Sequence, residues 1–149
     1  MSGSNLIFST STGGNAGVRS TNPLSARRAY FEMTITSQGS AAFNCGVVTS
    51  SMTADVDTGD PTSRGAAVVW ANGHFAPSGS LGAGFANGDI CCVAVDLGSK
   101  IIWFRNGGGS WNGSGANNPA TGVGGISFLS VTGPFYAFGG LSGVSEHDR

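Results

Sequence analysis

Residues 89–107 read DICCVAVDLGSKIIWFRNG, and they carry the clearest evidence in the sequence for its fold class. It holds two short apolar runs, residues 90–95 and residues 101–104, with a polar turn between them. Both runs are shorter than a typical helix and apolar at consecutive positions, which is the pattern of strands that are buried on both faces. The stretch therefore predicts two central strands of an all-β sandwich.

A strand of a different kind is predicted over residues 29–36. Its apolar side chains alternate, so that Phe31, Met33 and Ile35 share one face while polar side chains share the other. Further strands are expected at residues 6–8, 43–49, 66–71, 126–131 and 135–138, and no stretch keeps the periodicity of a helix. We expect the interior to contain Phe31, Met33, Ile35, Val93, Val95 and Phe104.

Turn signals separate these runs. The pair Asn-Gly, which favours tight hairpin turns, occurs four times, beginning at Asn72, Asn87, Asn106 and Asn112. All five prolines fall between apolar runs, where they interrupt no ladder of hydrogen bonds. Short strands with frequent turns predict an antiparallel sandwich.

The composition excludes several classes of protein. Charged residues make up 10% of the 149 residues and the net charge is −1, so the dense positive face that nucleic-acid binding requires is missing. No apolar stretch approaches the ~20 residues that span a bilayer, and the first residues do not form a signal peptide. Cys45, Cys91 and Cys92 are expected to be reduced core residues. We therefore predict a single domain over residues 1–149, made in the cytoplasm, with neither nucleic acid nor membrane as a partner.

Three segments, in this order, resemble the SPRY family of β-sandwich domains. They are AYFEMTI at residues 29–35, FANGDICCVAVDL at residues 85–97 and IIWFRNG at residues 101–107. The residues WNG at 111–113 and NPATG at 118–122 resemble a variant common in bacterial and phage SPRY-like domains. The resemblance covers about residues 6–140. It implies a bent, concanavalin-like sandwich of two antiparallel sheets, whose loops bind partner proteins or, in relatives of the wider fold, glycans.

The chain departs from this family at its C-terminal end. The family closes with a further strand after the segment equivalent to residues 135–140, whereas residues 141–149 are polar here. The strand at residues 6–10 is then left with an open edge, and it carries neither charge nor proline to block pairing. We therefore expect a neighbouring subunit or partner segment to complete the sheet, unless the chain is a fragment of a longer protein.

The carboxylates do not form a catalytic pattern. A glycosidase needs two carboxylates flanking the scissile bond, but the only glutamates are Glu32, within a strand, and Glu146, near the end. Asp89 and Asp96 bracket one strand and are expected to cap turns. The segment DVDTGD at 55–60 has the alternate carboxylates of a calcium loop without its closing glutamate, and the histidines and cysteines lack zinc spacing. The sequence thus predicts no catalytic residue, no metal site, no cofactor and no enzyme activity.

Two groups of aromatic and amide side chains are candidates for ligand binding. They are Trp70, Asn72 and His74 at a strand end, and Trp111, Asn112 and Asn117 in a loop rich in Gly, Ser and Asn. Trp111, in the middle of this loop, suggests that the loop is ordered and held against the body of the domain. Aromatic rings stack on sugar faces and amides bond hydroxyl groups, which favours a protein or glycan as the ligand. A second interpretation stays open, in which Trp70 and Trp111 close the ends of the sandwich as core residues. Trp103, within a strand, is expected to be core.

The sequence favours a non-catalytic binding module that recognises its ligand through loops at residues 55–64, 72–80 and 107–118. Low charge and abundant Gly, Ser and Asn suit a phage or bacterial surface protein in a virion or cell-surface assembly. The same features suit an alternative, a structural particle component such as a capsid decoration or tail-fibre domain. Its partner would be its own assembly, as a homo-oligomer.

Overall fold

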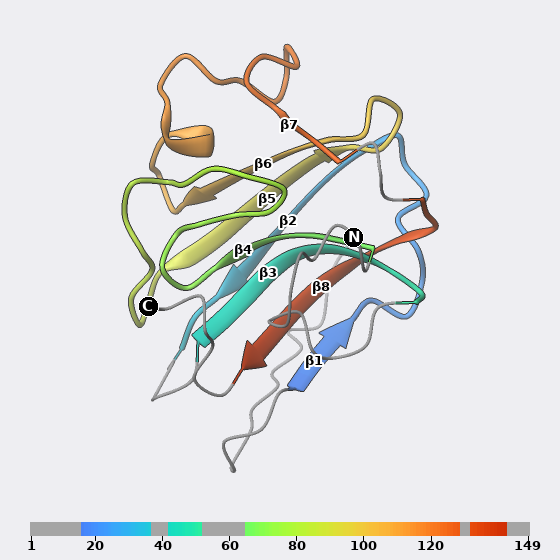
Figure 1. Cartoon of the computed structure of the whole chain (residues 1–149), viewed down its shortest axis with the longest axis horizontal. Coiled ribbons are helices and arrows are strands. Elements are labelled where there is room, and N and C mark those ends of the chain that lie inside the picture. The colour runs from blue at the N-terminus through green and yellow to red at the C-terminus, as the bar shows by residue number, and fades with distance from the viewer. Residues whose placement is uncertain (1–15, 37–41, 52–64, 129–131, 143–149) are drawn as a thin grey trace.

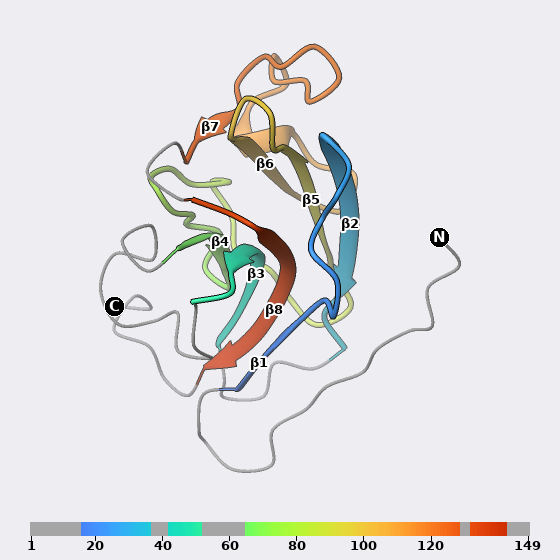
Figure 2. The ribbon, with the colours of Figure 1, turned by 90° about the vertical axis from the view of Figure 1, so that its right-hand side faces the viewer.

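In a computed structural model the chain folds as a sandwich of two antiparallel sheets, each of four strands (Figure 1 and Figure 2). The structure describes residues 16–36, 42–51, 65–128 and 132–142. The β3 sheet has the order β1-β8-β3-β4 and consists of β1 (Ala16–Arg19), β8 (Phe135–Ser142), β3 (Ala42–Thr49) and β4 (Ala66–Trp70). The β5 sheet has the order β2-β5-β6-β7 and consists of β2 (Arg28–Thr34), β5 (Ile90–Asp96), β6 (Ile101–Asn106) and β7 (Ile126–Ser127). The predicted fold class is confirmed, and no α-helix occurs among the described residues.

The stretch at residues 89–107 forms the centre of the β5 sheet. β5 and β6 pair in antiparallel register, with Val93 opposite Phe104, while β2 and β7 pair on their outer sides. Alternate side chains of both strands enter the core between the sheets. On the other face, Cys92, Ala94 and Trp103 are buried too. The burial of both faces that the sequence predicts is therefore confirmed.

The core contains the side chains that the sequence places there. Four of the six are buried, namely Ile35, Val93, Val95 and Phe104. Phe31 and Met33 pack against the same cluster but are only partly buried. Their strand, β2, lies at the edge of the β5 sheet and pairs only with β5 among the described strands. An edge strand has a neighbour on one side, which leaves its side chains less covered.

The β3 sheet joins the first and last described strands. β8 lies between β1 and β3 and pairs with both. It extends to Ser142, beyond the end that the sequence predicts for it, and β1 is a strand that the sequence does not predict. The strand expected at residues 6–10 lies outside the described residues, so its open edge and the completion of that edge by another chain stay predictions.

The three cysteines are free and buried, as predicted. Cys91 points into the core, where a hydrogen bond with Cys45 and burial raise the pKa of its thiol. Cys92 points to the opposite face, where it contacts Glu32. Adjacent residues on a strand face opposite ways, which explains why this pair does not form a bridge.

Candidate functional site

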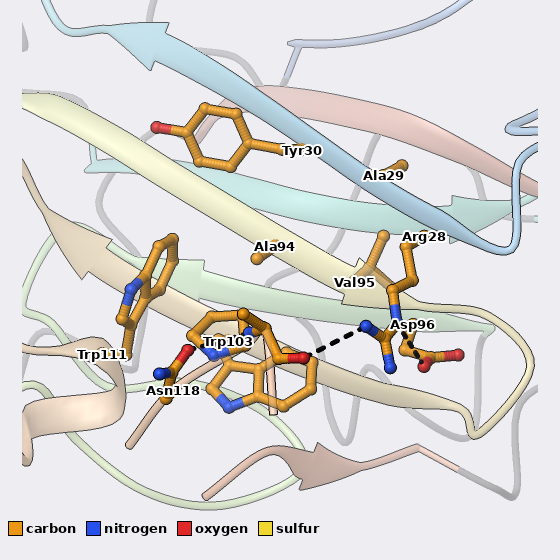
Figure 3. Close-up of a pocket in the computed structure, with 11 residues that line it drawn as sticks. Arg28, Ala29, Tyr30, Ala94, Val95, Asp96, Trp103, Trp111 and Asn118 are labelled. Atoms are coloured by element: carbon orange, nitrogen blue, oxygen red, sulfur yellow. Dashed lines mark hydrogen bonds and ion pairs between the residues drawn. The ribbon is translucent and has the colours of Figure 1, made fainter. Parts of the chain in front are cut away.

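A hollow lies on the outer face of the β5 sheet, where a small residue stands between two large ones. The strand register places Ala94 of β5 directly opposite Tyr30 of β2 on one side and Trp103 of β6 on the other. Because the Ala94 side chain is a single methyl group, it leaves a hollow between these two larger side chains, of which Tyr30 is half-exposed and Trp103 is buried (Figure 3). The pocket has a volume of about 400 Å³, within the usual range for small-ligand sites.

The loop between β6 and β7 forms a further wall of this pocket. A single side-chain amide, that of Asn112, holds the first part of this loop against the sheet. Asn112 accepts a hydrogen bond from the Phe104 N–H at 2.8 Å and donates to the carbonyls of Ile102 at 3.3 Å and Gly124 at 2.9 Å. Within the described residues, β7 pairs with Ile101 and Ile102 of β6. The Asn112 amide therefore takes the place of a neighbouring strand at Phe104, directly beyond this pairing. Its φ of 46° lies in the left-handed region that asparagine tolerates.

Further bonds hold the rest of this loop in place. Asn117 donates through its side-chain amide to the Trp111 carbonyl at 2.9 Å. Asn118 and Val123 exchange backbone hydrogen bonds, and the Trp103 indole N–H donates to the Val123 carbonyl at 2.9 Å. The ordered loop that the sequence predicts is confirmed. The amides of Asn112 and Asn117 are engaged inside it, so a ligand contact through either would compete with these bonds.

Trp111 is the aromatic residue of the loop that lines the pocket, and it lies in the 3-10 turn η2 (Trp111–Gly113). The Arg105 guanidinium lies over the Trp111 ring, 4.4 Å from its centroid, and covers one face of the indole. The Tyr30 ring stands nearly perpendicular to the indole, with ring centroids 6.3 Å apart. Partial desolvation and hydrogen bonds with Cys92 and Glu32 raise the pKa of the Tyr30 phenol, so it is neutral at physiological pH. The two rings form an aromatic corner with a neutral hydroxyl at its rim.

The opposite end of the pocket is charged. Asp96 accepts a hydrogen bond from the Arg28 Nε at 3.0 Å and from the Ser99 N–H at 3.0 Å, and the Arg27 Nε lies 3.7 Å from it. Arg28 also donates to the Ala120 carbonyl at 3.2 Å, which ties the loop to β2. Asp96 thus caps the turn after β5, as predicted, and in addition positions two arginines. Asp89 caps the turn before β5 through the Ala86 N–H.

The bonds to Asp96 make the stability of the protein depend on pH. The hydrogen bond from Ser99 and then the arginines hold the pKa of this carboxyl below its usual value, although burial opposes them. A carboxyl with a lowered folded-state pKa stabilises the fold above its unfolded pKa of about 4, and that stability is lost as the pH falls through the folded-state pKa. We expect Asp96→Asn to lower the urea midpoint at pH 6. The difference in urea midpoint between the variant and the unaltered chain should become smaller below about pH 4. A difference that is constant from pH 6 to pH 2.5 would contradict this role for the carboxylate.

The other predicted group lies elsewhere on the molecule. Trp70 is buried on the outer face of the β3 sheet, where it packs with Val68 and Phe138. Asn72 accepts the N–H of His74 at 3.0 Å within the turn, and the His74 side chain is exposed. Trp70 and Trp111 therefore lie on outer faces of opposite sheets, and the structure does not bring them together. Trp70 fits the interpretation as a packed core residue.

The loops that carry the two groups nevertheless touch. Gly113, beside Trp111, lies so close to the β4–β5 connection that a methyl group on it would come within 2.9 Å of the Ser80 carbonyl. The third predicted loop, residues 55–64, lies outside the described residues. It includes the carboxylates of the segment at residues 55–60 that resembles a calcium loop. Among the residues that are described, no three His, Cys, Asp or Glu side chains gather as a metal site would require.

Sequence reasoning missed Arg28, Tyr30 and Ala94 as pocket residues and took Trp103 only as core. Tyr30 had a usable signal. The alternation that turns Phe31 toward the core places Tyr30 on the outer face of β2, where a ring with a polar hydroxyl is suited to a binding surface. Ala94 had none, because its role depends on which side chains flank it across two strand pairings.

No protein-family model matches the chain, and no curated protein matches it either. No helix in the described part of the chain is long and apolar enough to cross a membrane. The site is therefore interpreted from its own geometry.

Proposed function

We propose that this chain is a non-catalytic, SPRY-like binding module, and that its protein or glycan ligand occupies the pocket on the outer face of the β5 sheet. One observation carries the proposal: Trp111 and Tyr30 line a hollow from two different segments, and Tyr30 is 50% exposed. Several hydrogen bonds preserve this arrangement without using the pocket faces of either ring. Preorganised, partly exposed aromatic rings are typical of recognition sites.

The chemistry of the pocket supports binding over catalysis. Its carboxylate, Asp96, is buried and already accepts bonds from Ser99 and Arg28, and its aspartate state is stabilised. A general base needs a pKa near the working pH, which this lowered pKa opposes. Of the residues that the structure describes, no second carboxylate lines the pocket to complete a hydrolytic pair.

A second candidate, a structural component of a particle, rests on where the exposed apolar side chains lie. Among the described residues, the large ones are Tyr30, Ile90 and Val123, and all three belong to the β5 sheet or its loop. A neighbouring subunit could cover this face. In either case we propose a place in a virion or a cell-surface assembly, as the sequence suggests.

Trp111→Ala tests the proposed site. We expect binding to weaken at least about tenfold, because truncating a central aromatic anchor removes its stacking surface. The melting temperature should change by only about 3 °C, since the ring is half-buried and its main partner is Arg105. Ligands come from a glycan array and a displayed peptide library, each screened with the unaltered chain and with the variant.

The matched control is His74→Ala, which alters the other predicted group and leaves the pocket intact. If His74→Ala abolishes binding and Trp111→Ala does not, the site lies in the β4–β5 connection. If neither library yields a ligand and the chain forms a defined homo-oligomer by light scattering, the structural role replaces the binding role.

A further inference from the structure

The two ends of the pocket differ in chemistry. Figure 3 shows Trp111 at one end and Arg28 at the other, with Ala94 and Trp103 between them. The first end offers the face of an indole, and the second offers a guanidinium. A ligand that fills the pocket therefore meets an apolar surface and a positive charge at the same time.

The charged end carries more positive than negative charge. Arg27 and Arg28 share the single carboxylate of Asp96. The Asp96 side chain is only 5% exposed, whereas those of Arg27 and Arg28 are 73% and 57% exposed. A ligand thus approaches the guanidinium groups rather than the carboxylate. This excess favours an anionic ligand group and disfavours a cationic one.

Arg28 keeps donors for such a group. A guanidinium has five N–H donors in a planar fork that matches a carboxylate. Arg28 uses Nε for Asp96 and Nη1 for the Ala120 carbonyl, and Nη2 has no acceptor among the described residues. These two bonds also fix the direction of the fork, so that little side-chain freedom is lost when a ligand binds.

Two side chains of the loop add polar groups suited to hydroxyls. Asn118 lines the pocket, and its Oδ1 accepts the Ala120 N–H at 2.9 Å. Its amide nitrogen and the indole nitrogen of Trp111 donate no hydrogen bond within the described residues, so both keep N–H donors. An aromatic face with amide and indole donors beside it is suited to a sugar ring, whose C–H face is apolar and whose hydroxyl groups lie at its edge.

We propose that this pocket, if it is the binding site proposed above, takes an acidic saccharide. The C–H face of one ring stacks on Trp111, and the carboxylate accepts hydrogen bonds from Arg28. Asn118 and the indole N–H bind hydroxyl groups. A peptide with an acidic side chain would also satisfy Arg28, and its backbone carbonyls could accept from the same N–H donors. The face of Trp111 favours the saccharide, and the test below separates the two ligands.

The test uses the ¹⁵N-labelled 149-residue chain and pairs of small probes. The probes are the methyl glycosides of glucuronic, galacturonic and N-acetylneuraminic acid, each compared with its own methyl ester, which keeps the ring and removes the charge. The indole N–H signals of Trp103 and Trp111 report on the pocket directly, even when affinity is in the millimolar range. We expect at least one acid to shift the Trp111 signal and to bind about tenfold more tightly than its ester, a preference that rising salt weakens.

Variants separate the role of Arg28 from a general charge effect. Arg28→Gln should remove the preference for the acid. Arg27→Gln, which removes a charge outside the pocket lining and leaves the Arg28 donors in place, should weaken the preference less. Arg28→Lys keeps the positive charge and should retain part of the preference for the acid. It is the control for the possibility that Arg28→Gln loses the preference because the loop has loosened.

Three results overturn the proposal in distinguishable ways. If the acid and its ester bind equally well, Arg28 does not recognise the carboxylate, although the pocket still binds a saccharide. No shift of the Trp111 signal by any probe, together with a Trp111-dependent peptide from the displayed library, overturns the saccharide and keeps the binding module. No Trp111-dependent ligand in either the glycan array or the peptide library means that the proposed function itself is wrong.

Discussion

Replacing Phe104 with alanine is expected to lower the free energy of unfolding by about 3–5 kcal/mol. The ring is fully buried, it pairs across the sheet with Val93, and it lies 5.8 Å from the ring of Phe75 between their centroids. Truncation removes the transfer energy of the ring and leaves a cavity that packed neighbours fill only in part. Urea unfolding, with its slope compared between the two proteins, measures the loss.

Phe31→Ala is the matched control for this experiment. The same side chain is removed, but from the edge strand β2, where it is only partly buried. Its cost should be smaller, because a partly exposed ring loses less transfer energy and water can enter the space that it leaves. A loss of under about 1 kcal/mol for Phe104→Ala would show that the sheets pack differently from the structure described here.

Asn112→Ala is expected to cost about 3 kcal/mol and to release the wall of the pocket. The substitution removes the acceptor of the Phe104 N–H and both donors to the carbonyls of Ile102 and Gly124. Leaving partly buried backbone groups without partners costs about 1–3 kcal/mol each, and alanine also tolerates the φ of 46° less well than asparagine. Hydrogen exchange at the Phe104 amide should accelerate by at least about tenfold.

Two variants show which of these contributions matters. Asn112→Asp keeps the acceptor for Phe104 and loses the donors, so exchange at Phe104 should change less than in the alanine variant. Asn117→Ala breaks one bond inside the loop and leaves the sheet contacts intact. If the Phe104 amide exchanges at the same rate in Asn112→Ala as in the unaltered chain, the Asn112 side chain does not protect the backbone at this edge of the sheet.

The sequence predicts this fold well where the signal is local. The β5–β6 pair follows from two apolar runs and the turn between them, and the position of Phe31 follows from alternation along one strand. β1 was missed because AGVR carries a single bulky apolar side chain and is recognisable as a strand only through its pairing with β8.

The candidate site was harder to predict, because it depends on residues brought together by strand register. Trp103 is buried, as the sequence predicts, but by the loop on the outer face of the sheet instead of by the opposite sheet. A run that is apolar on both faces does not reveal what covers the second face. Trp111 was correctly placed in an ordered loop, yet its partner Tyr30 lies eighty-one positions earlier and no short-range pattern connects them.

The place of β8 between β1 and β3 bears on how the chain acquires its structure during synthesis. The strands of the β5 sheet are all present once Ser127 has been made, and its central pair is a local hairpin that closes quickly. In the β3 sheet, β3 and β4 can pair early, but β1 reaches them through β8, which is the last of the described strands to be synthesised. Until β8 arrives, the apolar inner faces of both sheets lack their final packing, and an incomplete chain is then open to misassembly with its neighbours. The pairing of β8 with β1 and β3 is thus the step at which the two described sheets reach their final packing.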